Sequence, residues 1–229
     1  MKRKLFVSLL CAVLFLLLIF ALRTVDVRAI GPEGTAVGLS RINEAVHASL
    51  GVNMLWYQIT EILGYAAIAV GGLFALLGLA QCLRRRSLLR VDGEILALGV
   101  LYGAVIVLYL LFELAIVNYR PVLLPGEMQP EASFPSSHTM LSCVILGSAA
   151  VLLPVFVRSA GLRRGLQALC WLVLAVSVAG RLLSGVHWFT DILGGVLLSA
   201  ALISFYAWVV EALRPRRSRA SGGKHLPKR

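Results

Sequence analysis

Six long apolar segments divide the chain, and polar stretches separate them. They cover residues 5–22, 56–83, 94–118, 138–157, 165–183 and 190–213. Each segment is close to the ~20 residues that a helix needs to cross the hydrocarbon core of a bilayer. Lipid cannot satisfy open backbone groups, so such segments must be helical. The pattern therefore predicts an all-α fold, a bundle of six transmembrane helices that forms one membrane domain over residues 1–213.

The polar stretch at 35–54 has a helical pattern of its own. Its apolar face comprises Leu39, Ile42, Val46 and Leu50, and its polar face Arg41, Asn43, Glu44 and His47. We expect a short amphipathic helix that ends at Gly51 and lies at the outer membrane interface with its polar face in solvent. His47 is then a solvated residue rather than a ligand.

The first apolar segment has the basic start of a signal peptide, and the small-residue stretch "VRAIG" follows it. Its apolar core is longer than the roughly 7–15 residues of a signal peptide. We therefore interpret it as a retained transmembrane helix.

Composition agrees with a membrane protein. The 229 residues are 59% hydrophobic and 14% charged, with a mean hydropathy of +0.87. A soluble domain of this length keeps more charge for its surface. The excess of 22 Lys and Arg over 11 Asp and Glu first suggests an anionic partner such as nucleic acid.

The positions of the basic residues favour a different explanation. Most of them lie at 2–4, 84–90, 158–164 and from 214 onward, segments that share one side of the membrane if the helices alternate. This is the positive-inside pattern, so we expect both termini in the cytoplasm and no nucleic-acid partner. The basic tail 214–229 contains Pro, Gly and Ser and is predicted to be disordered.

Two arginines, Arg120 and Arg181, fall at the outer ends of apolar segments. Such an arginine either snorkels to the interface or binds an anion inside the bundle, and position alone favours neither. Their neighbours favour the anion site, because "NYRPVLLPG", "EASFPSSH" and "GRLLSGVHWFTD" all lie on the outer side. In the third, the carboxylate of Asp191 can accept the proton on one nitrogen of His187, which leaves the other nitrogen free to attack.

These motifs resemble those of the membrane type 2 phosphatidic acid phosphatases. That family has three motifs in a fixed order. The first is Lys followed by any six residues and Arg-Pro, and the second is Pro-Ser-Gly-His. The third is Ser-Arg, any five residues, His, any three residues and Asp. The matching positions here are Arg120 and Pro121, then Pro135, Ser136 and His138, then Arg181, His187 and Asp191. The order and the six-helix layout also agree, over residues 56–213.

The resemblance implies a role for each matched residue. His187 would be the nucleophile that takes the phosphoryl group, Asp191 would orient it, and His138 would protonate the leaving oxygen. The phosphate would be held by Arg120, Arg181, Ser136 and backbone amides at the start of the fourth helix, groups suited to anions. No acidic cluster suggests a metal site and the family needs none, so we expect neither a metal nor a cofactor.

Three positions depart from the family pattern. Ser137 replaces Gly and could supply another phosphate donor, Gly180 replaces Ser, and Glu113 replaces Lys. Glu113 lies two helical turns before Arg120 on the same face, where an anion opposes phosphate binding. We expect it to pair with an arginine and organise the pocket; otherwise it recognises a cationic or hydroxyl-bearing part of the substrate, or marks a weak or inactive enzyme.

The sequence thus predicts a metal-independent membrane phosphatase with an extracytoplasmic active site. Its substrate would be a lipid phosphomonoester or diphosphate such as undecaprenyl diphosphate, phosphatidic acid or phosphatidylglycerophosphate. The alternatives are a lipid phosphotransferase and a catalytically weak lipid-phosphate binding protein.

Overall fold

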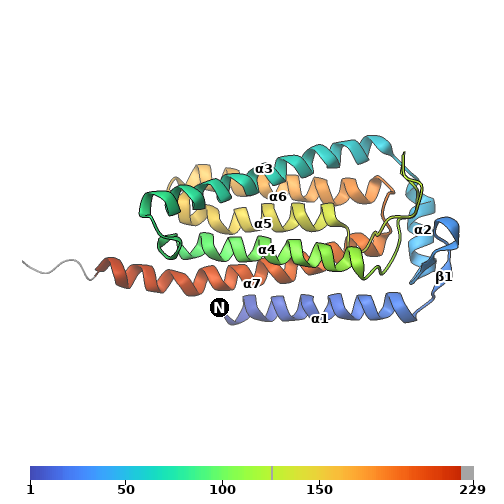
Figure 1. Cartoon of the computed structure of the whole chain (residues 1–229), viewed down its shortest axis with the longest axis horizontal. Helices are drawn as coiled ribbons and strands as arrows, with labels where there is room; N and C mark the ends of the chain where they lie inside the picture. The colour runs from blue at the N-terminus through green and yellow to red at the C-terminus, as the bar shows by residue number, and fades with distance from the viewer. Residues whose placement is uncertain (125, 223–229) are drawn as a thin grey trace, which may run out of the picture.

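Six long helices run side by side along the length of the molecule (Figure 1). The structure, a computed structural model, describes residues 1–124 and 126–222. Its elements are α1 (Lys2–Thr24), β1 (Arg28–Ala29), η1 (Pro32–Gly34), β2 (Ala36–Val37), α2 (Ser40–Leu50), α3 (Met54–Arg85), η2 (Leu88–Arg90), α4 (Gly93–Leu114), α5 (Ser137–Phe156), α6 (Ala160–Leu183) and α7 (Phe189–Gly222). All the α-helices except α2 are long and apolar enough to cross a membrane. The expected all-α bundle of six transmembrane helices with one short outer helix is confirmed, and the protein is a multi-pass membrane protein.

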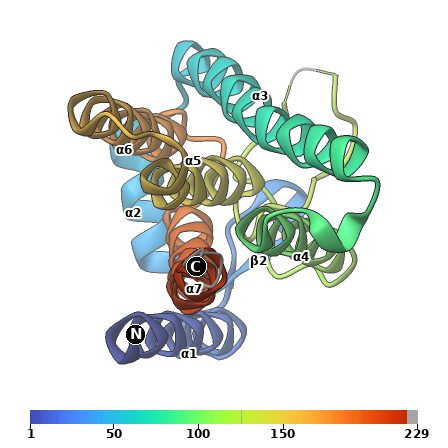
Figure 2. The ribbon, with the colours of Figure 1, turned by 90° about the vertical axis from the view of Figure 1, so that its left-hand side faces the viewer.

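Helix α5 lies at the centre of the bundle, between α3, α6, α7 and α4 (Figure 2). Its membrane span is 67% buried, whereas no other span exceeds 39%. A helix surrounded by protein can carry polar side chains that lipid would exclude. The N-terminus of α5 is therefore a protected place for polar groups.

The first apolar segment forms α1, which packs along α7. Phe15, Leu18 and Leu22 enter the hydrophobic core, and the Ser8 hydroxyl donates to the Ala201 carbonyl oxygen at 2.9 Å. These contacts make α1 part of the bundle.

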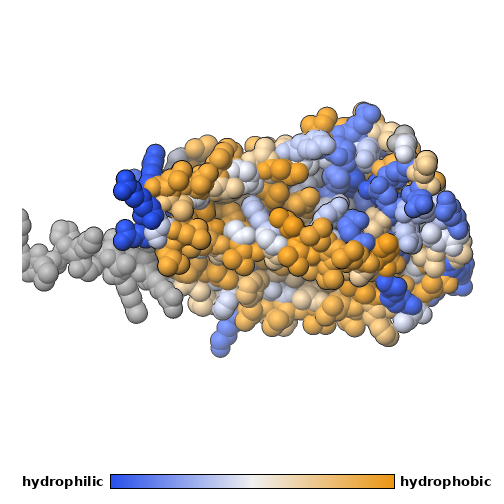
Figure 3. All heavy atoms as spheres, in the orientation of Figure 1, coloured by the Kyte–Doolittle hydropathy of each residue, from blue (hydrophilic) through white to orange (hydrophobic). Residues whose placement is uncertain are grey.

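The two ends of the bundle differ in what they carry. One end gathers α2, the β1–β2 hairpin and the long loop that follows α4, while the α3–α4 and α5–α6 connections lie at the other end (Figure 1). The space-filling view shows an apolar band between hydrophilic groups at both ends (Figure 3). The expected outer loops therefore do share one end of the molecule.

Helix α2 forms where the sequence predicted it, and Arg41 and Glu44 of its expected polar face are exposed, but the expectation was wrong for Asn43 and His47. Asn43 is completely buried, whereas Ile42 is 46% exposed. The Asn43 side chain donates to Gly38 O and Thr190 Oγ1, both at 3.0 Å, and accepts from Thr190 N. Asn43 thus satisfies a backbone donor in the first turn of α7. His47 is likewise half-buried, with its ring 5.4 Å from the ring of Trp188.

The end of α7 also differs from the expectation. The helix continues to Gly222, so the predicted disorder is wrong for 214–222. Residues 223–229 lie outside the described part of the chain.

Candidate active site

The loop between α4 and α5 folds back on itself as a short antiparallel pair. Arg120 N donates to Glu131 O at 3.0 Å, and Ser133 N donates to Asn118 O at 2.9 Å. This pairing brings Arg120 and Ser133 together although 12 residues separate them in sequence. The loop backbone therefore fixes two polar side chains at the end of the bundle where α5 and α7 begin.

Ser133 connects His187 to Asp191. Its hydroxyl donates to Asp191 Oδ2 at 2.5 Å and lies 2.9 Å from His187 Nδ1. The direct distance from His187 Nδ1 to Asp191 Oδ2 is 3.9 Å, which is too long for a hydrogen bond. The predicted direct contact between His187 and Asp191 is therefore wrong, since a serine stands between them.

The hydrogen bonds also determine which nitrogen of His187 carries the proton. Ser133 has one proton and donates it to Asp191, so its oxygen accepts from the Nδ1–H of His187. Nε2 then keeps its lone pair, and it is buried without a hydrogen-bond partner in the described residues. Burial lowers the pKa of His187 well below its usual value, and the charges of Arg181 and Arg120 lower it further. These contacts and charges favour the neutral ring, with a free lone pair on Nε2.

Asp191 is held in place by three donors. Besides Ser133, Trp188 N donates to Oδ2 at 2.9 Å, and Asn118 Nδ2 donates to Oδ1 at 3.2 Å. The carboxylate is fully buried, and a buried carboxylate needs such partners. Asp191 can therefore hold Ser133, and through it His187, in one orientation.

His138 and Arg181 meet at the carboxylate of Glu61 on α3. His138 Nε2 lies 2.9 Å and Arg181 Nη1 lies 3.0 Å from Glu61 Oε1. Arg181 Nη2 lies 3.0 Å from His138 Nδ1, and Nη1 also donates to Thr60 Oγ1. The guanidinium lies 4.8 Å from the centre of the Tyr57 ring. Arg181 is only 1% exposed, whereas the side chains of His138 and Glu61 are 29% and 22% exposed, so the guanidinium is buried and its two partners lie partly in solvent.

The two serines at the start of α5 have different environments. Ser136 is the N-cap of α5, with its side chain accepting from Thr139 N and its own N–H donating to Asp191 O at 3.0 Å. It is completely buried and does not line the cavity described below, so its geometry is that of a helix cap rather than the expected phosphate ligand. Ser137 does line the cavity.

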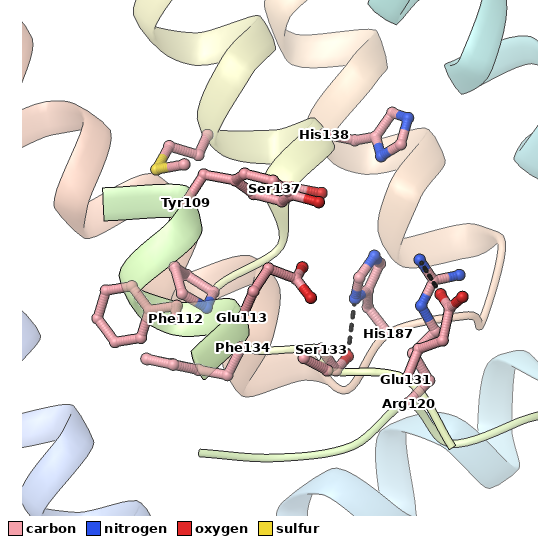
Figure 4. Close-up of a pocket in the computed structure, with 13 residues that line it drawn as sticks. Tyr109, Phe112, Glu113, Arg120, Glu131, Ser133, Phe134, Ser137, His138 and His187 are labelled. Atoms are coloured by element: carbon pink, nitrogen blue, oxygen red, sulfur yellow. Dashed lines mark hydrogen bonds and ion pairs between the residues drawn. The ribbon is translucent and has the colours of Figure 1, made fainter. Parts of the chain in front are cut away.

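A cavity of about 310 Å³ opens among these groups. One side is polar, and the other is formed by aromatic and apolar side chains. Its walls are formed by Tyr109, Phe112, Glu113, Arg120, Glu131, Ala132, Ser133, Phe134, Pro135, Ser137, His138, Met140 and His187. Figure 4 shows His187 between Ser133 and His138, with Arg120 and Glu131 beside it and the Glu113 carboxylate directed toward it. The cavity therefore combines two histidines, an arginine and an apolar wall.

Arg120 is only partly neutralised. Its Nη2 lies 3.3 Å from Glu131 Oε2 and its Nη1 lies 4.0 Å from Glu127 Oε1, yet Nε and Nη1 are buried without a hydrogen-bond partner in the described residues. Burial raises the pKa of Glu131, as do the nearby Glu127 and Glu113, while Arg120 opposes the shift. Arg120 thus retains N–H donors for an anion.

Glu113 does line the cavity, but the expected ion pair is absent. Among the described residues no arginine lies within 4.0 Å of its carboxylate, and Arg120 pairs with Glu127 and Glu131 instead. The expectation that Glu113 organises the pocket through an arginine is therefore wrong. What remains is a carboxylate directed into the cavity.

Gly180, another departure from the family pattern, lies where α6 touches α3. A Cβ atom added here would approach Thr60 Cγ2 and Trp56 Cε3 to 2.8 Å. The serine of the family would not fit beside these side chains without a shift. This glycine allows the close approach that places Arg181 against Thr60 and Glu61.

Three functional candidates were not found by sequence reasoning: Ser133, Asn118 and Glu61. Ser133 and Asn118 lie within the quoted motif stretches, but nothing in the sequence distinguishes them from their neighbours. Glu61 had a signal, because it is the only acidic residue in the apolar segment 56–83. An ionisable residue inside a membrane span is by default a candidate for function.

The arrangement suits the binding and attack of an anion with an electrophilic centre. The unpartnered N–H groups of Arg120 and the Nε–H of Arg181 need acceptors, and Nε2 of His187 offers a lone pair. A phosphoryl group supplies both, because its oxygens accept hydrogen bonds while its phosphorus accepts the lone pair. Within the described residues, no group of three or more His, Cys, Asp or Glu side chains is arranged to hold a metal ion.

Comparison with known proteins gives a family and a fold. The family model described as PAP2 superfamily matches residues 94–215. The chain is also similar to a solved structure, the first transmembrane PAP2 type phosphatidylglycerolphosphate phosphatase from Bacillus subtilis, with a TM-score of 0.66 and 17% identity. The match covers 90% of this chain and 97% of that one. No curated protein matches the sequence.

Proposed function

Because the chain belongs to the PAP2 superfamily, we propose that it is a membrane lipid phosphatase that uses His187 as its nucleophile. The observation that carries this proposal is the state of His187. Its Nε2 is buried, has no partner in the described residues and borders a cavity that also contains Arg120. A phosphohistidine intermediate would form when Nε2 attacks the phosphorus atom.

The surrounding residues divide the remaining tasks. Arg120 and Ser137, which line the cavity, bind the phosphoryl oxygens. Arg120 is suited to this because its Nε and Nη1 atoms lack hydrogen-bond partners in the described residues. Arg181 does not line the cavity, but it contacts His138, which does, and its Nε–H, which also lacks a partner in the described residues, completes the phosphate site when the substrate binds. Asp191 and Ser133 keep Nδ1 of His187 protonated and stabilise the positive ring that forms when the N–P bond is made. His138 protonates the leaving oxygen and later takes a proton from the water that hydrolyses the intermediate.

The substrate is a lipid phosphomonoester or diphosphate. The apolar cavity wall, formed by Tyr109, Phe112, Phe134 and Met140, lies at the end of the apolar band and can contact a lipid chain. The positive-inside pattern supports a position of this end outside the cytoplasm, with both termini inside. Undecaprenyl diphosphate, phosphatidic acid and phosphatidylglycerophosphate are the candidates, and the last is the substrate after which the similar solved protein is named.

A second candidate is a weak or inactive enzyme that binds lipid phosphates. Glu113 favours it, because this carboxylate faces the cavity at the position where the family has Lys. A phosphotransferase ranks below both, because the described residues provide no identified acceptor site.

The test is phosphate release by the purified protein in detergent micelles, with each candidate lipid and with EDTA present. We expect metal-independent release by the wild type and none by His187→Ala. Equal release by both proteins would refute the nucleophile. No release by a folded wild type, together with retained binding of the lipid, would establish the second candidate.

A further inference from the structure

We propose that Glu61 is a positioning residue for phosphoryl transfer, whose carboxylate stabilises the protonated form of His138 once substrate phosphate binds Arg181. The inference rests on the proposed function and adds a residue that lies outside the three family motifs. It starts from the cluster in which Glu61 contacts His138 Nε2 at 2.9 Å and Arg181 Nη1 at 3.0 Å.

The contacts define the protonation of His138. A guanidinium only donates hydrogen bonds, so Arg181 Nη2, at 3.0 Å, donates to His138 Nδ1. Nε2 therefore carries the single ring proton and donates it to Glu61. In this state His138 is neutral, and both of its nitrogens are already engaged.

A neutral His138 in these contacts cannot act as the general acid. It needs a second proton on Nδ1, and Arg181 occupies the lone pair where that proton would bind. Phosphate oxygens compete for the same N–H groups of Arg181, because arginine binds phosphate through a planar set of donors. Binding of the substrate would thus release Nδ1 to accept a proton from solvent.

Glu61 is what stabilises the resulting imidazolium. Its carboxylate is mostly shielded from solvent, with 22% of the side chain exposed, so its attraction for a nearby cation is only partly screened. The backbone supports this contact as well: a Cβ atom added at Gly64, one turn after Glu61, would lie 3.3 Å from His138 Cδ2. Glycine at this position lets the ring lie close against α3.

In the resulting reaction, His138 gives up one proton in the first step and takes one back in the second. Nε2 of His187 forms a bond to phosphorus as the ester O–P bond breaks, and the leaving oxygen takes the proton on Nδ1 of His138. Water then attacks phosphorus, the N–P bond breaks, and His138 takes the proton that water loses. Throughout these steps Nε2–H of His138 stays hydrogen-bonded to Glu61.

The simpler explanation is that Glu61 only neutralises the buried Arg181, and a comparison of leaving groups distinguishes the two. Dodecyl phosphate expels an alkoxide that must be protonated, whereas a dodecyl-substituted 4-nitrophenyl phosphate expels a phenolate that needs no proton. The full-length wild type and the variants Glu61→Gln and Glu44→Gln are assayed in detergent micelles on both substrates. Glu44 is an exposed residue of α2 and is the matched control.

We expect Glu61→Gln to lower kcat/KM, which reports formation of the phosphohistidine and not its hydrolysis, by about tenfold or more on dodecyl phosphate. On the aryl phosphate kcat/KM should change by less than about twofold, because its leaving group needs no proton. His138→Ala should show the same selectivity, and Glu44→Gln none. Partial unfolding of a variant lowers both rates together and leaves their ratio unchanged, so the ratio reports the chemistry.

The outcomes separate the inference from the function on which it rests. If Glu61→Gln keeps the wild-type ratio of the two rates while the wild type is active, the role assigned to Glu61 is wrong and the phosphatase proposal stands. If the wild type releases phosphate from neither substrate nor from the lipids named above, the proposed function fails, and the inference fails with it.

Discussion

The carboxylate of Asp191 is linked to the ring of His187 by the hydroxyl of Ser133. The nearest polar atoms of the two side chains are 3.9 Å apart, and the Ser133 hydroxyl bridges them with contacts of 2.5 and 2.9 Å. A serine in this position transmits the effect of the carboxylate, because its single proton goes to Asp191 and its oxygen must then accept from the ring. In the proposed mechanism, this chain of three residues, Asp191, Ser133 and His187, orients the nucleophile.

This chain predicts a selective loss of rate in Ser133→Ala. Without the hydroxyl, Nδ1 of His187 loses its acceptor and the productive tautomer is no longer enforced, so kcat should fall by roughly ten- to a hundredfold with little change in KM. The control is Ser177→Ala, which removes a buried hydroxyl that only bonds within its own helix, to Val173 O. In a double mutant with Asp191→Asn the losses should not add, because the two residues act in series; fully additive losses would contradict the chain.

The burial of His187 predicts its protonation behaviour. Its lowered pKa means that the neutral, nucleophilic ring persists as the pH falls through the usual histidine value of about 6.5, and that a proton binds only at lower pH. NMR of histidine-labelled protein, with the signal assigned by its loss in His187→Gln, measures this directly. Arg120→Gln should move the titration to higher pH, because it removes one of the cations that disfavour the charged ring. Titration of His187 at or above pH 6.5 in the wild type would refute the assigned environment.

Replacement of Glu113 by a cationic residue is predicted to strengthen the binding of substrate rather than weaken it. Replacing this carboxylate by the family lysine, in Glu113→Lys, puts a cation where an anion faces the cavity, so KM for a lipid phosphate should fall by about tenfold, equivalent to ~1.4 kcal/mol. The KM of Glu113→Gln should lie between those of the wild type and Glu113→Lys. The control Glu33→Lys, at an exposed position, should leave KM unchanged. If Glu113→Lys raises KM for a substrate whose head group carries an amine and lowers it for phosphatidic acid, the carboxylate recognises that amine. An unchanged KM for every substrate would show that Glu113 does not act on the bound phosphate.

The contact between α6 and α3 predicts that restoring the family residue at Gly180 is harmful. Gly180→Ser would press against Trp56 and Thr60, and such overpacking typically destabilises by ~1–3 kcal/mol. The melting temperature should therefore fall by several degrees, roughly in proportion. Gly165→Ser on the same helix is the control, because a Cβ atom there meets nothing within 4 Å. Equal melting temperatures for the two variants would contradict the packing.

The sequence predicted the six helices because a bilayer imposes a length and an apolar composition that a linear pattern records. It predicted the arrangement of His138 and His187 only through motifs, since spacing alone does not bring distant segments together. The position of Ser133 depends on backbone pairing within the loop, which no periodicity reveals. Asn43 was misplaced for a similar reason: its partner, Thr190, lies 147 residues away, so local amphipathicity assigned it to the solvent.

Glu61 is the case where sequence reasoning could have succeeded. A lone carboxylate in an otherwise uncharged span is costly to bury without a partner, and the two cationic candidates, His138 and Arg181, were already identified at the same end of the bundle. What the sequence does not contain is the helix rotation that directs Glu61 at both of them.

The central claim is that Nε2 of His187 takes the phosphoryl group, and the most direct measurement is to trap that intermediate. Wild type and His138→Ala, which should slow the hydrolysis of the intermediate, are mixed with the dodecyl-substituted 4-nitrophenyl phosphate carrying ³²P, whose leaving group needs no proton, and stopped with alkali within one turnover. Phosphohistidine is stable in base and labile in acid, so mass spectrometry of the digested protein can locate it. We predict a phosphoryl group on His187, more abundant in His138→Ala and absent from His187→Ala. Phosphate release by the wild type with no label on residue 187, or with the label on another residue, would contradict the claim.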